Sequence, residues 1–265
     1  AQLFPYLVQS NSLLSYKSRL GCKYCQTVKL QLRFIFLKAC RLNSFKMRWL
    51  PLESNPDVMN KYMANLGLPS SWQFSDVYGL DPELLAIVQK PVAAVSLLYP
   101  LTDKTDSTEI GKQDPKGELY FVKQTIGNAC GTMCLIHAVL NNMDSIELDS
   151  SKHLIKFFEA TKGMTPEERA DHLEKDNAFE VAHEESALEG QTQAPGKDDE
   201  VKCHFVAFVH RNGGLWELDG RKDAPVFHGP TTADTLLEDT TVIIKKFMER
   251  DPDEVNFSVV ALNKA

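Results

Sequence analysis

The stretch that decides the fold is residues 203–219, which read CHFVAFVHRNGGLWELD. Residues 203–210 are apolar enough to form a buried strand, and the pair Asn212-Gly213 is the strongest short signal for a tight hairpin turn. Residues 215–219 then form the returning strand. We therefore expect a β-hairpin.

The hairpin register makes a prediction about two polar side chains. A two-residue turn pairs Arg211 with Gly214, which places Val206 opposite Asp219. Because residues two apart in a strand share a face, His204 and Asp219 then lie diagonally on one face, within reach of each other. A three-residue loop would put them on opposite faces, whereas a four-residue loop would preserve the arrangement.

Helix and strand signals alternate over the rest of the chain without a repeat. We expect helices after the Asn55-Pro56 and Asp81-Pro82 starts and at 129–142, 151–160, 165–176 and 236–250. We expect strands at 72–78, 92–99 and 255–262, an extended segment at 119–122, and polar loops at 101–118 and 182–200. This pattern indicates one α+β domain.

A second informative stretch precedes the helix predicted at 129–142. Gln124 is followed after five residues by Cys130, which lies at the first turn of that helix. Unpaired backbone N–H groups and the positive end of the helix dipole favour a thiolate at such a position. The amide of Gln124 could stabilise a negative oxygen on a substrate.

Together these residues predict a thiol hydrolase. Cys130 supplies the nucleophile, His204 the base, Asp219 the group that orients the base, and Gln124 with the Cys130 backbone N–H the oxyanion hole. The alternative is that each side chain is merely packed, since a cysteine on an apolar helix usually belongs to the core.

Other chemistries have weaker support. A zinc site from Cys130, Cys134, Cys203 and His204 is disfavoured because Cys203 and His204 are adjacent in a strand and point oppositely. We expect no metal and no cofactor. His137 is a rival base on the helix of Cys130, but its apolar neighbours indicate a buried, satisfied side chain. The remaining histidines lack an acid at a spacing that sequence can interpret; they are His153, His172, His183, His210 and His228.

The charge distribution divides the chain near Met47. Residues 1–46 carry eight Lys or Arg and no acid, so the rest holds 21 of the 29 basic residues and all 36 acidic ones. The basic part is a targeting segment or sequence translated upstream of a start at Met47. Its CxxC pair, Cys22 and Cys25, leaves open the alternative that the protein has a redox or metal-binding function. We expect a single domain at 47–265.

The composition also bounds partners and location. An acidic body disfavours nucleic acid and suits a basic partner. Three scattered cysteines after residue 47 fit a reducing compartment. No apolar run is long enough to span a bilayer, so we expect no membrane partner. These features favour a cytoplasmic protein.

Several stretches resemble a known family, the ubiquitin carboxyl-terminal hydrolases of the small, papain-like type, and within it the isozyme L3 subgroup. The resembling stretches are 48–53 (RWLPLE), 72–79 (WQFSDVYG), 123–132 (KQTIGNACGT), 183–192 (HEESALEGQT), 218–222 (LDGRK) and 247–254 (FMERDPDE). Residues 1–46 have no counterpart in the family.

The resemblance implies an α-β-α sandwich with a central, mostly antiparallel sheet and a knotted backbone. It implies the catalytic roles already assigned to Cys130, His204, Asp219 and Gln124. It makes residues 182–200 a crossover loop over the active site, which only a narrow chain can thread. Substrate-binding residues carried over from the family are Leu52, Glu53, Asn128, Glu189, Gly190, Gln191 and Thr192.

The implied activity is removal of small adducts or unstructured peptides from the C-terminal glycine of ubiquitin, with NEDD8 as a second candidate. We expect a cytoplasmic, monomeric, cysteine-type deubiquitinase. The alternative is a module that binds ubiquitin or NEDD8 with little turnover, because the same fold could serve either purpose.

Overall fold

The computed structural model describes residues 47–199 and 201–265. The predictions made for residues 1–46, including the Cys22 and Cys25 pair, lie outside the described residues. Within the described ranges, none of the helices combines the length and the apolar character needed to cross a bilayer.

The centre of the fold is a seven-stranded sheet in which all neighbouring strands pair antiparallel. In spatial order its strands are β1 (Trp72–Asp76), β7 (Ser258–Lys264), β2 (Val92–Pro100), β4 (Cys203–Arg211), β5 (Gly214–Leu218), β6 (Val226–Pro230) and β3 (Lys112–Gln113). The strand that comes last in the chain, β7, thus lies between β1 and β2.

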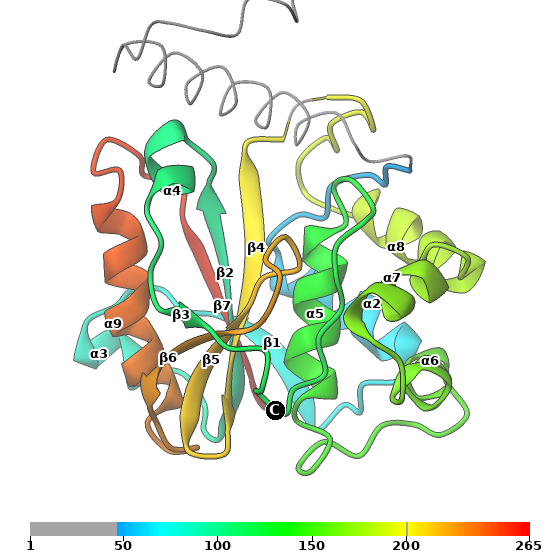
Figure 1. The fold of residues 1–265 in the computed structure, drawn as a ribbon, viewed down its shortest axis with the longest axis horizontal. Coiled ribbons are helices and arrows are strands. Elements are labelled where there is room, and N and C mark those ends of the chain that lie inside the picture. Colours follow the sequence, from blue (N-terminus) through cyan, green and yellow to red (C-terminus); the bar gives the residue numbers. More distant parts are fainter. Residues whose placement is uncertain (1–46, 200) are drawn as a thin grey trace, which may run out of the picture. The chain divides into compact units, whose positions relative to one another are not determined.

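Helices cover both faces of this sheet (Figure 1). One side carries α2 (Pro56–Leu66), α5 (Cys130–Leu140), α6 (His153–Thr161), α7 (Pro166–Leu173) and α8 (Asn177–Ala187), and the other carries α3 (Pro82–Leu85) and α9 (Leu236–Glu249). The short helix α4 (Asp103–Ser107) follows β2. The predicted α-β-α sandwich is confirmed, and the knot stays a prediction.

The alternation of side chains along β4 divides the core into two layers. Phe205, Ala207 and Val209 pack with the α5 side, whereas Val206 and Phe208 pack with the α9 side. Burial on both faces explains the near-continuous apolar sequence of β4.

The hairpin between β4 and β5 has the predicted register. Arg211 pairs with Gly214 and Ala207 with Leu218. Asn212 and Gly213 have φ values of 51° and 75°, and the type I′ turn requires such positive values at both central positions. Turn chemistry therefore fixes the register that determines which side chains share a face.

Two helix starts also follow their predicted chemistry. The side chain of Asn55 accepts a hydrogen bond from the backbone N–H of Asp57 at 2.9 Å, with Pro56 at the first helical position of α2. Thr165 and Glu168 form a reciprocal capping box at the start of α7.

The loop predicted at 101–118 is wrong in part. It contains α4, a single helical turn held by a capping box between Thr102 and Thr105, and the two-residue strand β3. Neither element has an apolar period, so a hydrophobic pattern could not indicate it. Strand β6 was missed for a similar reason, and residues 119–122 are extended without joining the sheet.

The loop predicted at 182–200 begins too early. Residues 182–187 belong to α8, which ends at Ala187. The side chain of Asp176 caps this helix, and Phe179 and His183 lie one turn apart on its buried face. At His183 the buried face of α8 carries a histidine instead of an apolar residue, so the hydrophobic pattern did not indicate a helix there. The crossover loop therefore starts at Leu188 and leads to β4.

Candidate active site

The N-terminus of α5 presents Cys130 as its first residue. The preceding turn is held by a short parallel bridge, in which Trp49 N–H donates to the carbonyl of Gly127 at 3.0 Å and Gly127 N–H donates to the carbonyl of Met47 at 2.9 Å. Asn128, with a φ of 62°, turns the chain into the helix. The thiol is thus fixed at the positive end of a buried helix.

His204 and Asp219 meet as the hairpin register predicts. The Nε2 atom of His204 lies 2.7 Å from Oδ1 of Asp219, and the two residues are only 2% and 3% exposed. The backbone N–H of Arg221 donates to the same oxygen at 2.9 Å. The edge of the Tyr99 ring packs against the imidazole, with centroids 5.8 Å apart. These contacts fix the orientation of the imidazole.

Electrostatics links this imidazole to the thiol of Cys130. Burial by itself raises the pKa of the thiol, but the hydrogen bond to His204 and the charge of His204 outweigh burial, so the Cys130 pKa is lowered. Burial by itself lowers the pKa of His204, but the charge and hydrogen bond of Asp219, with the contribution of Cys130, raise it to about 9. Both shifts favour a thiolate–imidazolium pair.

Asp219 is ionised in this arrangement. Its burial alone would raise its pKa, but His204 by charge and hydrogen bond, then Lys222 by charge, hold the pKa well below the usual range of a carboxyl group. A permanently charged carboxylate at this place can keep the ring of His204 in one orientation and stabilise its protonated form.

Gln124 lies close to the turn that follows Asp219. Its backbone N–H donates to the carbonyl of Gly220 at 2.9 Å. Its side-chain Nε2 donates to the carbonyl of Ile126 at 3.1 Å, while Oε1 is buried and has no hydrogen-bond partner among the described residues. The side-chain amide of Gln124 is therefore held through its nitrogen, beside the segment that leads into α5.

The predicted substrate-binding residues form two groups. Leu52 is buried against the first turn of α5, where a Cβ at Gly131 would lie 2.9 Å from the Leu52 Cβ. The carboxylate of Glu53 faces the crossover loop, accepts a hydrogen bond from the N–H of Thr192 at 3.4 Å, and occupies the space that a side chain at Gly190 would need.

The remaining members of that set lie in the turn before Cys130 and in the loop that faces Glu53. Asn128 donates through Nδ2 to the carbonyls of Trp49 at 3.1 Å and Lys197 at 3.2 Å. Glu189 forms an ion pair with Lys61 at 2.5 Å. Gln191 is exposed. The structure therefore places the crossover loop against the Glu53 segment, Lys61 on α2 and the turn that precedes Cys130.

Two of the histidines for which the sequence spacing indicated no acid have an acidic partner in the structure. His153 contacts Asp176 at 2.8 Å, and His228 contacts Glu217 at 2.8 Å. Both pairs form between elements whose relative placement depends on tertiary structure, which residue spacing could not provide. His137 is buried as expected but is only partly satisfied: its Nε2 accepts the N–H of Val122 at 2.9 Å, whereas its Nδ1 is buried and has no hydrogen-bond partner among the described residues. Burial lowers its pKa to about 4.

A polar chain behind α5 had no sequence signal. The hydroxyls of Tyr62 and Thr132 are 2.9 Å apart, Thr132 Oγ1 lies 2.7 Å from His183 Nδ1, and His183 Nε2 lies 2.5 Å from the carbonyl oxygen of Leu50. This chain joins α2, α5, α8 and the N-terminal segment. Thr132 lies two residues after Cys130 in the first turn of α5, so this network helps to fix the helix turn that carries Cys130.

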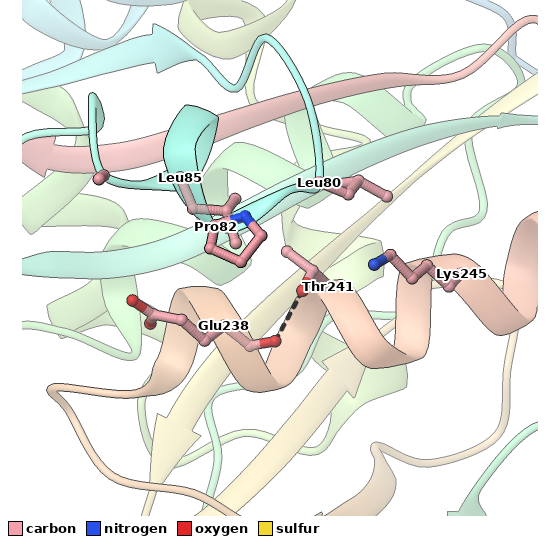
Figure 2. A pocket seen from close by; sticks show the side chains of 7 residues that line it. Leu80, Pro82, Leu85, Glu238, Thr241 and Lys245 are labelled. Carbon is pink, nitrogen blue, oxygen red and sulfur yellow. Dashed lines mark hydrogen bonds between the residues drawn. The ribbon is translucent and has the colours of Figure 1, made fainter.

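Metal and pocket geometry do not suggest another centre. In the part of the chain that the structure describes, no three His, Cys, Asp or Glu side chains are grouped to hold a metal ion. A hollow of about 280 Å³ between the α3 region and α9 is lined by Leu80, Pro82, Leu85 and residues of α9 (Figure 2). It contains none of the four predicted catalytic residues.

Comparisons with known proteins agree on one family. The family model described as "Ubiquitin carboxyl-terminal hydrolase, family 1" matches residues 49–249. The chain belongs to the ubiquitin carboxyl-terminal hydrolase family. The predicted class of cysteine-type ubiquitin hydrolases is thereby confirmed at the level of the family.

Curated relatives from distant organisms support the same family. The chain is 56% identical to a ubiquitin carboxyl-terminal hydrolase of Aplysia californica over 210 residues, which cover 78% of this chain and 98% of the relative. It is 45% identical to ubiquitin carboxyl-terminal hydrolase 3 of Arabidopsis thaliana over 84% of this chain and 97% of the relative. It is 43% identical to ubiquitin carboxyl-terminal hydrolase isozyme L1 of Rattus norvegicus, over 83% of this chain and 100% of the relative. The isozyme L3 subgroup stays a prediction.

Solved structures confirm the fold. The UCH37 catalytic domain of Trichinella spiralis, determined bound to ubiquitin vinyl methyl ester, superposes with a TM-score of 0.69 and 24% identity, covering 83% of this chain and 97% of that one. The described residues therefore have the papain-like fold of a ubiquitin carboxyl-terminal hydrolase catalytic domain.

Proposed function

We propose that the protein is a deubiquitinating thiol hydrolase that acts through Cys130, His204, Asp219 and Gln124. The observation that carries this proposal is the buried pairing of His204 with Asp219 next to a thiol whose pKa is lowered by that same histidine. A thiolate and an imidazolium in contact are the reactants of cysteine-dependent acyl transfer.

The reaction begins with attack of the Cys130 thiolate on the carbonyl carbon of the substrate's terminal glycine. The carbonyl oxygen becomes negative and is stabilised by the Cys130 backbone N–H and the second N–H of the Gln124 amide. The imidazolium of His204 gives its proton to the leaving amine, alcohol or thiol, which leaves a thioester on Cys130. His204, then neutral, takes a proton from water, which attacks the thioester and releases the acid.

The substrate class follows from the family and from the crossover loop. The names of the relatives, and the ubiquitin vinyl methyl ester bound to the Trichinella spiralis structure, point to ubiquitin. The loop lies against Glu53, Lys61 and Asn128, so the opening to Cys130 suits a narrow chain. Small adducts and unstructured peptides on the C-terminal glycine are the substrates that fit.

Further properties belong to the same proposal. NEDD8 is a second substrate candidate because its attachment chemistry is the same. The mechanism uses only side chains of this protein and requires no cofactor. The acidic balance after residue 46 disfavours nucleic acid. A monomer in the cytoplasm, with residues 47–265 as its one domain, is consistent with all of these features.

The test is turnover of a fluorogenic amide of the ubiquitin C-terminus. We expect turnover by the wild-type protein, none by Cys130→Ala, and nearly full activity for Cys203→Ala, which removes a half-buried thiol that has no proposed role in the reaction. A vinyl ester of ubiquitin should label Cys130 and no other cysteine. If wild type bound ubiquitin tightly without turning over the amide, the protein would be a binding module and the proposal would be wrong.

A further inference from the structure

The turn that follows Asp219 supports two parts of the proposed site at once. Asp219 orients His204, while the next residue, Gly220, accepts the backbone N–H of Gln124 at 2.9 Å. The orienting carboxylate and the oxyanion donor are thus attached to neighbouring residues of one turn, although Gln124 comes from a distant part of the sequence.

The approach between Gly220 and Gln124 is too close for any other residue at 220. A Cβ on Gly220 would lie 2.9 Å from the Gln124 Cβ, 3.1 Å from the Gln124 backbone nitrogen and 3.3 Å from the carbonyl oxygen of Val122. Two of these are backbone atoms, and the Cβ of Gln124 is fixed to its backbone. The extra carbon cannot be accommodated by rotating a flexible side chain.

The turn is held in place by contacts of its own. Lys222 N–H closes the turn onto the carbonyl of Asp219 at 2.9 Å, and Lys222 Nζ pairs at 2.6 Å with Glu217. Glu217 is fully buried and also contacts His228 at 2.8 Å. A buried carboxylate with two cationic or hydrogen-bonding partners resists displacement, because breaking the pair would leave an uncompensated charge.

The segment of Gln124 reaches the same turn a second time. Lys123 Nζ donates to the carbonyl of Lys222 at 2.6 Å and pairs with the exposed carboxylate of Asp223 at 3.0 Å. The residues at 123 and 124 therefore contact the 219–222 turn at two places, while the backbone N–H of Lys123 also donates to the carbonyl of Pro166 at 3.2 Å. If a Cβ were added at 220, we expect the anchored turn to stay and Gln124 to move.

We propose that Gly220 is a positioning residue for the oxyanion donor: its missing side chain lets the Asp219 turn set the distance of the Gln124 amide from Cys130. The inference rests on the proposed role of Gln124. It assigns Gly220 no contact with the substrate, and it predicts that Gly220 affects the reaction only through Gln124.

The test is a double-mutant cycle on turnover of the fluorogenic ubiquitin amide. We expect Gly220→Ala to lower kcat by about 10- to 100-fold with little change in KM, because an ångström of misplacement or a lost oxyanion donor has effects of this size. In a Gln124→Ala background, Gly220→Ala should change kcat less than about 2-fold, since the two substitutions then act on one interaction. Gly163→Ala is the matched control, because a Cβ at that exposed glycine meets no atom within 4 Å.

A second readout separates positioning from general damage to the fold. Alkylation of Cys130 by iodoacetamide, followed on the Cys130 peptide by mass spectrometry, needs the thiolate and His204 but no oxyanion donor. We expect Gly220→Ala to keep the wild-type alkylation rate and its pH dependence. Slowed alkylation would show that the turn had moved instead, and would overturn the inference.

The outcomes for Gln124 and Gly220 are distinguishable. If Gln124→Ala left kcat unchanged, the proposed function of Gln124 would fail. If Gln124→Ala lowered kcat but Gly220→Ala had no effect, or reduced kcat by the same factor in both backgrounds, only the positioning role of Gly220 would fail.

Discussion

Asp219 Oδ1 accepts two hydrogen bonds at once, one from the ring of His204 at 2.7 Å and one from the backbone N–H of Arg221 at 2.9 Å. The second bond fixes the carboxylate in its own turn, so that the first can fix the imidazole. The negative charge of Asp219 is therefore held at a fixed position beside His204. Removing that charge alone should have a measurable effect on activity.

The variant Asp219→Asn keeps the size of the side chain and removes its charge. An amide can present an N–H to the ring, which favours the wrong tautomer of His204 and no longer stabilises the imidazolium. We expect kcat/KM to fall by about 10²- to 10⁴-fold, as for the orienting acid of other triads. Circular dichroism should show an unchanged fold, and a kcat/KM within about 3-fold of wild type would contradict this role.

The pH profile of kcat/KM should be bell-shaped, because the reactive form is the thiolate–imidazolium pair. Activity rises as Cys130 ionises, at a pH below the ordinary pKa of a thiol, since His204 lowers the Cys130 pKa. It falls as His204 loses its proton, and its raised pKa puts this alkaline limb near pH 9. A single rise through pH 6.5, with no alkaline limb, would indicate a neutral pair instead.

The same shift has a consequence for stability. Because the folded-state pKa of His204 is raised above its unfolded value, its contribution to the free energy of unfolding is complete below about pH 6.5 and is lost as pH rises toward about 9. Urea unfolding of wild type against His204→Gln should therefore show a difference that shrinks over this window. A difference that grew with pH would contradict the assigned direction.

Thr132 should matter for stability because it connects Tyr62 to His183 inside the core. Thr132→Val keeps the shape but leaves buried polar groups on both neighbours without this partner, at an expected cost of about 1–3 kcal/mol. Urea unfolding measures the loss. Thr108→Val is the control, since that exposed hydroxyl bonds only to a neighbouring backbone carbonyl at 3.3 Å and should change stability by less than about 0.5 kcal/mol.

Asn128 should hold the crossover loop. Its Nδ2 bonds to the carbonyls of Trp49 and Lys197, while its φ of 62° is one that glycine adopts freely. Asn128→Gly therefore removes the two side-chain bonds without backbone strain. We expect limited proteolysis to cut the loop after Leu188 several-fold faster while the melting temperature changes little; an unchanged cleavage rate would show that the loop is held by other contacts.

Sequence reasoning succeeded where local chemistry determines geometry. The Asn212-Gly213 turn fixed the hairpin register, and the register placed His204 and Asp219 on one face. It failed where a pair depends on the packing of separate elements. The pairing of Glu217 with His228 depends on how β6 joins β5, and β6 itself carries no alternating pattern.

The limits of the pattern search are clearest in α8. His183 occupies a core position there because Thr132 and the Leu50 carbonyl satisfy both of its ring nitrogens. A hydropathy pattern counts histidine as polar and cannot anticipate such partners. Likewise, the spacing of Cys130 and His204 in the sequence gave no measure of their separation in space, and Gly220 showed its close approach to Gln124 only in three dimensions.

The place of β7 in the sheet has a consequence for synthesis of the protein. Within the described residues β1 joins the sheet only through β7, so the ribosome must release residues 258–264 before β1 can dock. Until then the nascent chain exposes β1 without any partner strand and the free edge of β2, both of which are prone to pairing with other chains. A nascent chain stalled before residue 258 would therefore be a substrate for chaperones rather than a working hydrolase.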